Sequence, residues 1–217
     1  MKKIGVVLSG CGVYDGSEIH EAVLTLLAID RQGCEALCMA PNVDFPVTDH
    51  LTKRETGEKR GVLAESARIA RGDIRDIREV TATDLDAIIF PGGFGVAKNL
   101  CDFAVKGAAA HVNPEVARLL KEMAVAGKPI GAVCIAPALI AAVLGKEYSP
   151  TVTIGNDAGT AAEIEKSGAI HQECPVTGFV VDRKNKIVTS PAYMLATRIS
   201  EVCEGIDTCV REVVKLM

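Results

Sequence analysis

The amino-acid sequence predicts one α/β domain with a mostly parallel central sheet covered by helices. Two patterns carry this prediction. Short apolar runs rich in Val and Ile are typical of buried strands, and longer segments between them place apolar residues at helical spacing. The chain has 217 residues, 48% of them hydrophobic, and contains no internal repeat, low-complexity tract or linker. We therefore expect residues 1–217 to form a single domain.

The first half of the chain predicts strands, two helices and one polar excursion. The expected strands are 3–8, 35–39, the short edge strand 74–80 and the fully apolar 87–90, and the expected helices are 17–31 and 64–71. Residues 42–59 are polar, carry proline and several turn formers, and predict a surface excursion over one end of the sheet.

The second half continues the alternation. Pro114 at a first helical turn and Gly127 after the last one predict a helix over 114–126. The remaining expected elements are a buried strand at 129–133, further strands of the sheet at 152–154 and 176–181, a turn at 182–186 leading into a hairpin strand at 187–189, and a last helix over 193–216.

Composition excludes several classes of function. The formal net charge is −4 with mixed signs, so no basic stripe predicts nucleic-acid binding. The apolar runs at 82–90 and 130–144 are too short or too interrupted for a membrane span of roughly 20 residues. The apolar stretch at 4–8 ends too soon for a signal peptide and predicts a core strand instead. We therefore expect no membrane partner.

The eight cysteines indicate a reducing compartment, and we expect a cytoplasmic protein. They are scattered, and several lie in apolar or helical settings. Cys34 and Cys38 have the interval of a metal pair, but no second pair or His-rich segment follows. We predict no metal and no other cofactor.

Cys134 is the candidate nucleophile. Residues 131–138 read Gly-Ala-Val-Cys-Ile-Ala-Pro-Ala, where a buried strand meets a helix and small residues flank the cysteine. This pattern predicts a nucleophile elbow, a sharp turn that small neighbours permit. A thiol at a helix N-terminus lies near free amides and the positive end of the dipole, which predicts a depressed pKa. The alternative is an inert buried cysteine.

A glycine-rich loop at 90–95, Phe-Pro-Gly-Gly-Phe-Gly, follows the central strand. The backbone amides of Gly92 and Gly93, with that of Ile135, are predicted to bind the substrate by polarising its carbonyl. The alternative is a plain turn. A phosphate site is not favoured because the loop lacks both the GxGxxG order and a P-loop lysine.

The loop after the first strand, residues 9–21, carries Asp15, Glu18 and Glu21 to the same sheet edge. Glu18 and Glu21 share one helical face by their three-residue spacing. A carboxyl held against a thiolate in a partly apolar site should be protonated, donate to sulfur and act as acid or base. The alternative is that both are first-turn residues of a helix capped by Ser17.

Together these motifs resemble the PfpI and class I glutamine-amidotransferase-like superfamily. Three longer stretches are similar to its ElbB group, the enhancing-lycopene-biosynthesis proteins, and the similarity spans the whole chain. They are Leu-Ser-Gly-Cys-Gly-Val-Tyr-Asp-Gly at 8–16, Pro-Gly-Gly-Phe-Gly at 91–95 with Ala-Lys-Asn-Leu at 97–100, and Ser-Pro-Ala-Tyr-Met at 190–194.

The resemblance implies a flavodoxin-like three-layer sandwich, a homodimer or higher homo-oligomer, and glutathione-independent glyoxalase activity on a small dicarbonyl, glyoxal or methylglyoxal. Cys134 would form a hemithioacetal, and a glutamate would move a proton between the two carbons through an enediol. Glu21 fits that glutamate by its spacing from Gly33, with Glu18 as the alternative. The name of the group suggests a link to isoprenoid metabolism.

Departures from the wider superfamily narrow the prediction. Ile135 stands where many relatives have histidine, which argues against peptidase activity. The His-x-Glu that amidotransferases place before the final helix is missing. The sequence His171-Gln172-Glu173 mimics it but precedes the last hairpin, so we expect a surface position. His111 is the histidine that could approach the site, from its own or a neighbouring subunit.

Two rival functions use the same cysteine. Cys134 could be a redox sensor or stress-response thiol without significant turnover, because an activated exposed thiolate oxidises readily. The chain could also be a glutaminase or accessory subunit, which the missing His-x-Glu argues against. A Cys11–Cys134 disulfide is conceivable because both residues lie at the same sheet edge.

Overall fold

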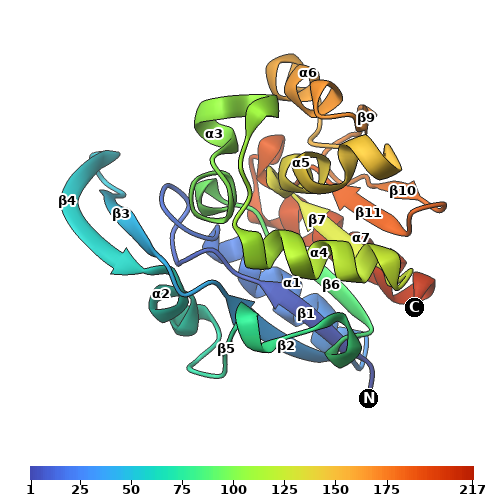
Figure 1. Ribbon diagram of the computed structural model, residues 1–217, viewed down its shortest axis with the longest axis horizontal. Helices are drawn as coiled ribbons and strands as arrows, with labels where there is room; N and C mark the ends of the chain where they lie inside the picture. Colours follow the sequence, from blue (N-terminus) through green and yellow to red (C-terminus); the bar gives the residue numbers. More distant parts are fainter.

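The computed structural model describes all 217 residues and has a seven-stranded sheet at its centre (Figure 1). The strand order is β10-β11-β7-β6-β1-β2-β5. The strands are β1 (Lys3–Val7), β2 (Glu35–Ala40), β5 (Arg75–Asp76), β6 (Ala87–Phe90), β7 (Ile130–Val133), β10 (Val180–Asp182) and β11 (Ile187–Ser190). Every neighbouring pair is parallel except β10 and β11. The predicted α/β class with a mostly parallel sheet is confirmed.

Helices cover both faces of the sheet, which gives three layers (Figure 1). On one face, α1 (Ile19–Arg31), α2 (Val62–Ile69) and α7 (Ile199–Leu216) pack on a core that includes Ile4 and Val6. On the other, α4 (Pro114–Val125) and α5 (Ala136–Tyr148) pack on Val7 and Ile88. Strand side chains alternate between the faces, so one apolar run supplies both cores.

The polar segment after β2 forms a two-stranded arm of β3 (Asp44–Asp49) and β4 (Arg54–Gly61). Figure 1 shows the arm projecting from the body of the protein. Phe45 and Val47 are buried, whereas β4 is exposed along nearly all of its length. The expected surface excursion is therefore a regular hairpin, which its polar composition did not reveal.

Three predicted strands of the central sheet lie elsewhere or are shorter. The segment expected at 152–154 contributes β8 (Thr151–Val152), which pairs with β9 (Ile170–His171) in a separate two-stranded sheet. The strand expected at 176–181 is reduced to β10. At 74–80 the strand has only two residues, because Asp76 caps a 3₁₀ turn at Ile77–Glu79 and accepts from the Arg78 N–H.

The last helix begins at Ile199 rather than at 193. Pro191 and a 3₁₀ turn at Ala192–Met194 precede it, and Ala192 has φ of +44°, which no α-helix accommodates. Three further segments were not predicted: α3 (Phe103–Lys106), α6 (Ala158–Lys166), which packs on α5, and a π-helical turn at Val96–Leu100.

The parallel strands β1, β6, β7 and β11 are consecutive neighbours in the sheet. Their carboxyl ends therefore meet at one edge, where open α/β sheets bind ligands. The loops that follow them carry the motifs at 9–21, 90–95, 134–138 and 190–194.

Candidate active site

Cys134 occupies a sharp turn between β7 and α5 with φ of +60°, a left-handed conformation that is strained for a residue with a side chain. Its N–H donates to the Ser190 carbonyl oxygen at 3.0 Å. The side chain is 8% exposed and lies in a cavity of about 420 Å³. The cavity is lined by Val13, Glu18, Gly93, Phe94, Cys134, Ile135, Asp157, Thr160, Tyr193 and Met194.

Glu21 lies next to the sulfur and is completely buried. Its Oε2 accepts from the Gly92 N–H and its Oε1 from the Tyr193 N–H, both at 3.0 Å. The carboxyl lies beside the Cys134 side chain, since Glu21 Oε2 and Cys134 Sγ both border the space next to Gly92. Glu21 is thus the glutamate that faces Cys134, held by one amide at each oxygen.

Glu18 has a different place. It is the N-cap of α1, and its Oε2 accepts from the Glu21 N–H at 2.7 Å. The side chain also contributes to the cavity wall. The expected cap, Ser17, instead accepts from the Ser9 N–H at 2.9 Å through its hydroxyl, because the helix begins two residues later than predicted.

Gly92 is required by close packing. A Cβ at this position would overlap Cys134 Cβ and Glu21 Oε2. The absence of a side chain lets the loop after β6 lie directly against the cysteine and the glutamate.

The predicted amide donors divide into two groups. The amides of Gly93 and Ile135 lie near the Cys134 thiol and act to lower its pKa. The Gly92 N–H is committed to Glu21, so the prediction that it polarises a substrate carbonyl is wrong. Its role is to position the carboxyl. Gly93 and Ile135 also line the cavity, where their amides are near any group bonded to sulfur.

Burial governs the protonation of the pair. It raises the pKa of Glu21 from 4.5 to about 7. Burial, and then the neighbouring Glu21 carboxylate, raise the pKa of Cys134 well above its ordinary value, although the Gly93 and Ile135 amides oppose this. The depressed pKa expected from the helix N-terminus is therefore wrong for the isolated thiol. The two groups hold at least one proton between them at neutral pH.

Tyr193 is a site residue that sequence reasoning missed. Besides donating its N–H to Glu21, it lines the cavity, and its hydroxyl lies 2.7 Å from His20 Nδ1. The strained backbone of Ala192 precedes it. The sequence motif at 190–194 indicated a resemblance to other proteins, but it did not predict a contact with Glu21.

No histidine lines the cavity. His111 has a side chain that is 79% exposed and lies beside Lys106 and Asp102. The ring of His171 accepts from the Ile154 N–H at 3.3 Å and is half-buried rather than on the open surface. Across the whole chain, no three metal-ligating side chains come together.

All eight cysteines are free thiols, so Cys11 and Cys134 are not joined. Cys11 lies near Glu65 and Arg68 of α2, and burial and Glu65 raise its pKa.

The residues of this site lie in a segment of the sequence that known proteins share. Residues 11–198 match the DJ-1/PfpI family, and this match includes the cysteine elbow, both glutamates and the Pro-Gly-Gly loop. The chain belongs to the DJ-1/PfpI family. Further solved structures at 13–19% identity, with TM-scores from 0.55 to 0.64, share the fold alone.

Several DJ-1/PfpI relatives are much closer. The human glutamine amidotransferase-like class 1 domain-containing protein 3, mitochondrial, is 49% identical over 99% of this chain and 83% of its own length. The mitochondrial ES1 protein of Danio rerio is 33% identical over 98% of this chain and 85% of its own. A crystal structure from Ehrlichia chaffeensis, an isoprenoid biosynthesis protein with an amidotransferase-like domain, has a TM-score of 0.94 at 40% identity, covering 100% and 99% of the two chains.

No helix of the protein combines the length and the hydropathy that a membrane crossing would need.

Proposed function

We propose that the protein is a glutathione-independent glyoxalase that converts glyoxal or methylglyoxal to the hydroxyacid. The observation that carries this proposal is the placement of the buried Glu21 carboxyl beside the buried Cys134 thiol, next to a ligand-sized cavity. A nucleophile in contact with an acid–base whose pKa is about 7 suits chemistry in which protons move at neutral pH.

The first step adds sulfur to the aldehyde. With one proton on the pair, the Cys134 thiol holds it, and the Glu21 carboxylate takes this proton as the sulfur attacks the carbonyl. The S–C bond forms, the carbonyl π bond breaks, and the new alkoxide takes the proton from Glu21. The amides of Gly93 and Ile135 stabilise the sulfur as it loses its proton and lie near the developing oxyanion.

Glu21, now a carboxylate, acts as the base in the second step. It removes the proton from the carbon bonded to sulfur, the oxygen on the neighbouring carbon is protonated to give an enediol, and Glu21 returns its proton to that neighbouring carbon while the hydroxyl on the first carbon loses its proton. The first carbon is oxidised to a thioester and the second is reduced to an alcohol, so no external oxidant is needed. Water then cleaves the thioester, releasing the hydroxyacid and the Cys134 thiol.

The charge around the cavity favours an uncharged substrate. Glu18 and Asp157 line it, Glu21 lies beneath the sulfur, and no Lys or Arg side chain lines it. A neutral dicarbonyl enters such a site without repulsion, whereas the anionic hydroxyacid product is repelled. The same negative charge around the cavity disfavours anionic substrates.

The rival functions have less support. A redox-sensing thiol would give no role to the ligand-sized cavity that Cys134 lines. A glutaminase needs a histidine near the nucleophile, and none lines the cavity. The link to isoprenoid biosynthesis belongs to the printed name of the Ehrlichia protein, and for this chain we propose it only as the metabolic setting of the carbonyl chemistry.

We further propose a homodimer in a reducing compartment, the cytoplasm. The outer face of α1 carries Ile19, Val23 and Leu27, which are 43%, 48% and 39% exposed and recur every four residues. Such an apolar stripe supports pairing with a second copy. Val23→Asp should reduce the mass measured by light scattering to that of one chain. The eight free thiols support the compartment.

The decisive experiment measures glycolate from glyoxal and lactate from methylglyoxal, without glutathione, for wild type, Cys134→Ala, Glu21→Gln and Glu18→Gln. We expect no turnover in Cys134→Ala, a loss of at least about 100-fold in Glu21→Gln, and a smaller loss in Glu18→Gln. Absence of turnover in wild type, or turnover that persists without Cys134, contradicts the proposal. Peroxide-dependent oxidation of Cys134 with negligible turnover would favour the sensor.

A further inference from the structure

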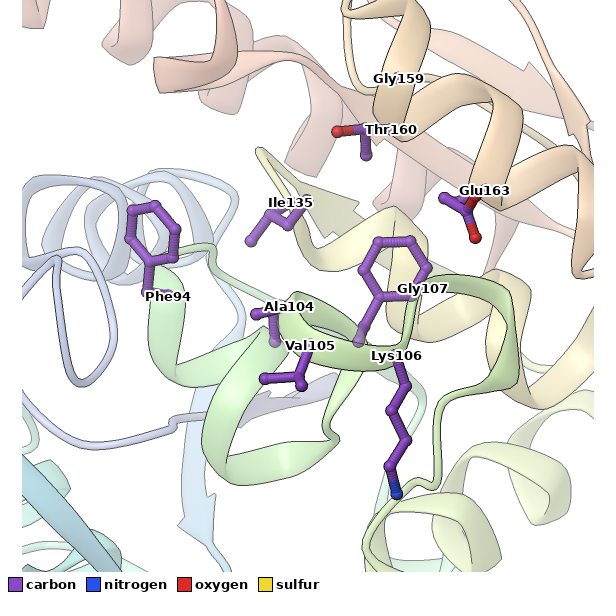
Figure 2. A pocket seen from close by; sticks show the side chains of 11 residues that line it. Phe94, Ala104, Val105, Lys106, Gly107, Ile135, Gly159, Thr160 and Glu163 are labelled. Atoms are coloured by element: carbon purple, nitrogen blue, oxygen red, sulfur yellow. The ribbon is translucent and has the colours of Figure 1, made fainter.

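A second cavity, of about 530 Å³, adjoins the one that holds Cys134 (Figure 2). Figure 2 shows it between the segment at 103–107, the start of α6, and the residue that follows the nucleophile. Its lining comprises Phe94, Ala97, Phe103, Ala104, Val105, Lys106, Gly107, Ile135, Gly159, Thr160 and Glu163. We call it the outer cavity.

The two cavities share a wall. Phe94, Ile135 and Thr160 line both of them. Because Ile135 directly follows Cys134 in the chain, a group bonded to the sulfur can extend past the Ile135 side chain into the outer cavity. The outer cavity is thus a continuation of the reaction site rather than a separate depression.

The size of this space exceeds what the smallest dicarbonyls need. Pockets of roughly 300–1,000 Å³ accommodate drug-sized ligands, and each of the two cavities is within that range. Glyoxal has only four non-hydrogen atoms, and methylglyoxal has five. Either substrate would leave the outer cavity to water.

The lining favours an uncharged, apolar occupant. Phe94 and Val105 expose 48% and 85% of their surface, although a large apolar side chain is normally covered. The charged residues of the lining are already paired. Lys106 contacts Asp102, and Glu163 contacts Lys166 and accepts from the Ala108 N–H. In Figure 2 the Lys106 side chain points away from the cavity.

We propose that the outer cavity binds the apolar tail of the substrate, so that the preferred substrates are 2-oxoaldehydes bearing an uncharged alkyl or aromatic group. The proposal rests on the proposed glyoxalase function and adds the substrate class to it. The reactive aldehyde lies over Cys134, and the tail lies between Phe94, Ile135 and Val105. The chemistry is unchanged: water is added, the aldehyde carbon is oxidised and the neighbouring ketone carbon is reduced.

The test compares phenylglyoxal with glyoxal in wild type and in variants that fill the outer cavity from opposite walls. Ala104→Trp places an indole at 103–107, and Gly159→Phe places a ring at the start of α6. Both positions are exposed, and a Cβ at Gly159 would have its nearest neighbour at 3.6 Å. Ala126→Trp, at an exposed alanine that lines neither cavity, is the matched control.

We expect wild type to have a kcat/KM for phenylglyoxal at least tenfold above that for glyoxal. Ala104→Trp and Gly159→Phe should each lower kcat/KM for phenylglyoxal by tenfold or more, which is the effect expected when an aromatic contact is partly lost. Each should leave kcat/KM for glyoxal within about twofold of the wild-type value. Ala126→Trp should change neither. Equal losses for both substrates, or no preference in wild type, overturn the proposal.

Failure of the proposed function gives a different pattern. If wild type turns over neither substrate, binding of acetophenone, an apolar ketone without an aldehyde, is measured by calorimetry. Binding that Ala104→Trp weakens by tenfold supports the outer cavity as an apolar subsite independently of turnover, and no binding overturns it. If Ala104→Trp and Gly159→Phe both dissociate the oligomer, the proposal is also overturned, because a second copy of the chain would then cover the outer cavity.

Discussion

Glu21 Oε1 accepts a hydrogen bond from the backbone N–H of Tyr193 at 3.0 Å, across 172 positions of the sequence. The bond joins the first helix to the turn before the last one. With the Gly92 N–H on the other carboxyl oxygen, it fixes the only fully buried acidic side chain next to the sulfur. The position of the Glu21 carboxyl is therefore set by backbone atoms from two distant loops.

The packing of Gly92 gives the first prediction. In Gly92→Ala the new Cβ overlaps Cys134 and Glu21, so one of them must move. We expect turnover to fall at least about 100-fold, because small displacements of reacting groups have effects of this size. Overpacking should destabilise the fold by about 1–3 kcal/mol.

The matched control for Gly92→Ala is Gly61→Ala, where φ is −78° and the nearest atom to a new Cβ is 3.8 Å away. Kinetics and urea unfolding of both variants provide the measurement. Full activity in Gly92→Ala would contradict the assigned contact.

The raised pKa of Glu21 predicts how stability depends on pH. The folded protein binds this proton more tightly than the unfolded chain, with pKa of about 7 against 4.5. The stabilisation is complete below pH 4.5 and is lost as the pH rises through 7, a change of about 3 kcal/mol. Glu21→Gln cannot titrate here and should lose this slope.

Urea unfolding between pH 4 and 8 measures this slope as the difference in unfolding free energy between wild type and Glu21→Gln. Glu173→Gln, at an exposed glutamate, should retain the wild-type pH dependence. A wild-type curve parallel to that of Glu21→Gln would show that folding does not raise the pKa of Glu21.

The same pKa predicts the acid limb of the rate profile. The catalytic form has one proton on the pair of Cys134 and Glu21, and a second proton silences the nucleophile or the base. We expect kcat/KM for glyoxal to rise tenfold per pH unit below about 7 and to level above it. A profile whose acid limb lies near 4.5, the ordinary pKa of a glutamate, would argue against Glu21 as the base.

Asn99 gives a prediction about the loop that carries the site. Its Nδ2 donates at 2.8 Å to the carbonyl oxygens of Ser9 and Asp15, and so joins the loops after β1 and β6. Asn99→Ala should destabilise the protein by about 2 kcal/mol, and Asn99→Asp by more, because a carboxylate would face two carbonyl oxygens. Asn42→Asp, at an exposed asparagine, should stay within about 0.5 kcal/mol of wild type. Thermal and urea unfolding of the three variants test this order.

The central strands and the elbow were predictable from sequence because they depend on local pattern. The apolar run before Cys134 requires a buried strand, and the small residues on either side of the cysteine permit the turn. Glu21 and Glu18 could be placed at the right sheet edge by topology. Which of them faces the sulfur depends on where α1 begins, and helix ends are the least certain part of such predictions.

What could not be predicted depends on contacts between distant segments. Neither residue type nor spacing indicates that the Gly92 amide is occupied by Glu21 or that Tyr193 holds the other oxygen. The direction of the Cys134 pKa was wrong for the same reason. The helix N-terminus is visible in the sequence, whereas complete burial beside a carboxylate is a property of the assembled cavity. The two-stranded arm was missed because exposed polar strands lack an apolar period.

The two amides that hold Glu21 come from residues 92 and 193, and this has a consequence for the order of assembly. During synthesis, helix α1 and the cysteine elbow leave the ribosome before the segment that contains Tyr193. The thiol and its carboxyl partner therefore cannot be locked together until β11 has joined β7. A chain that ends before Tyr193 therefore contains Cys134 and Glu21 but lacks one of the two amides that hold the Glu21 carboxyl.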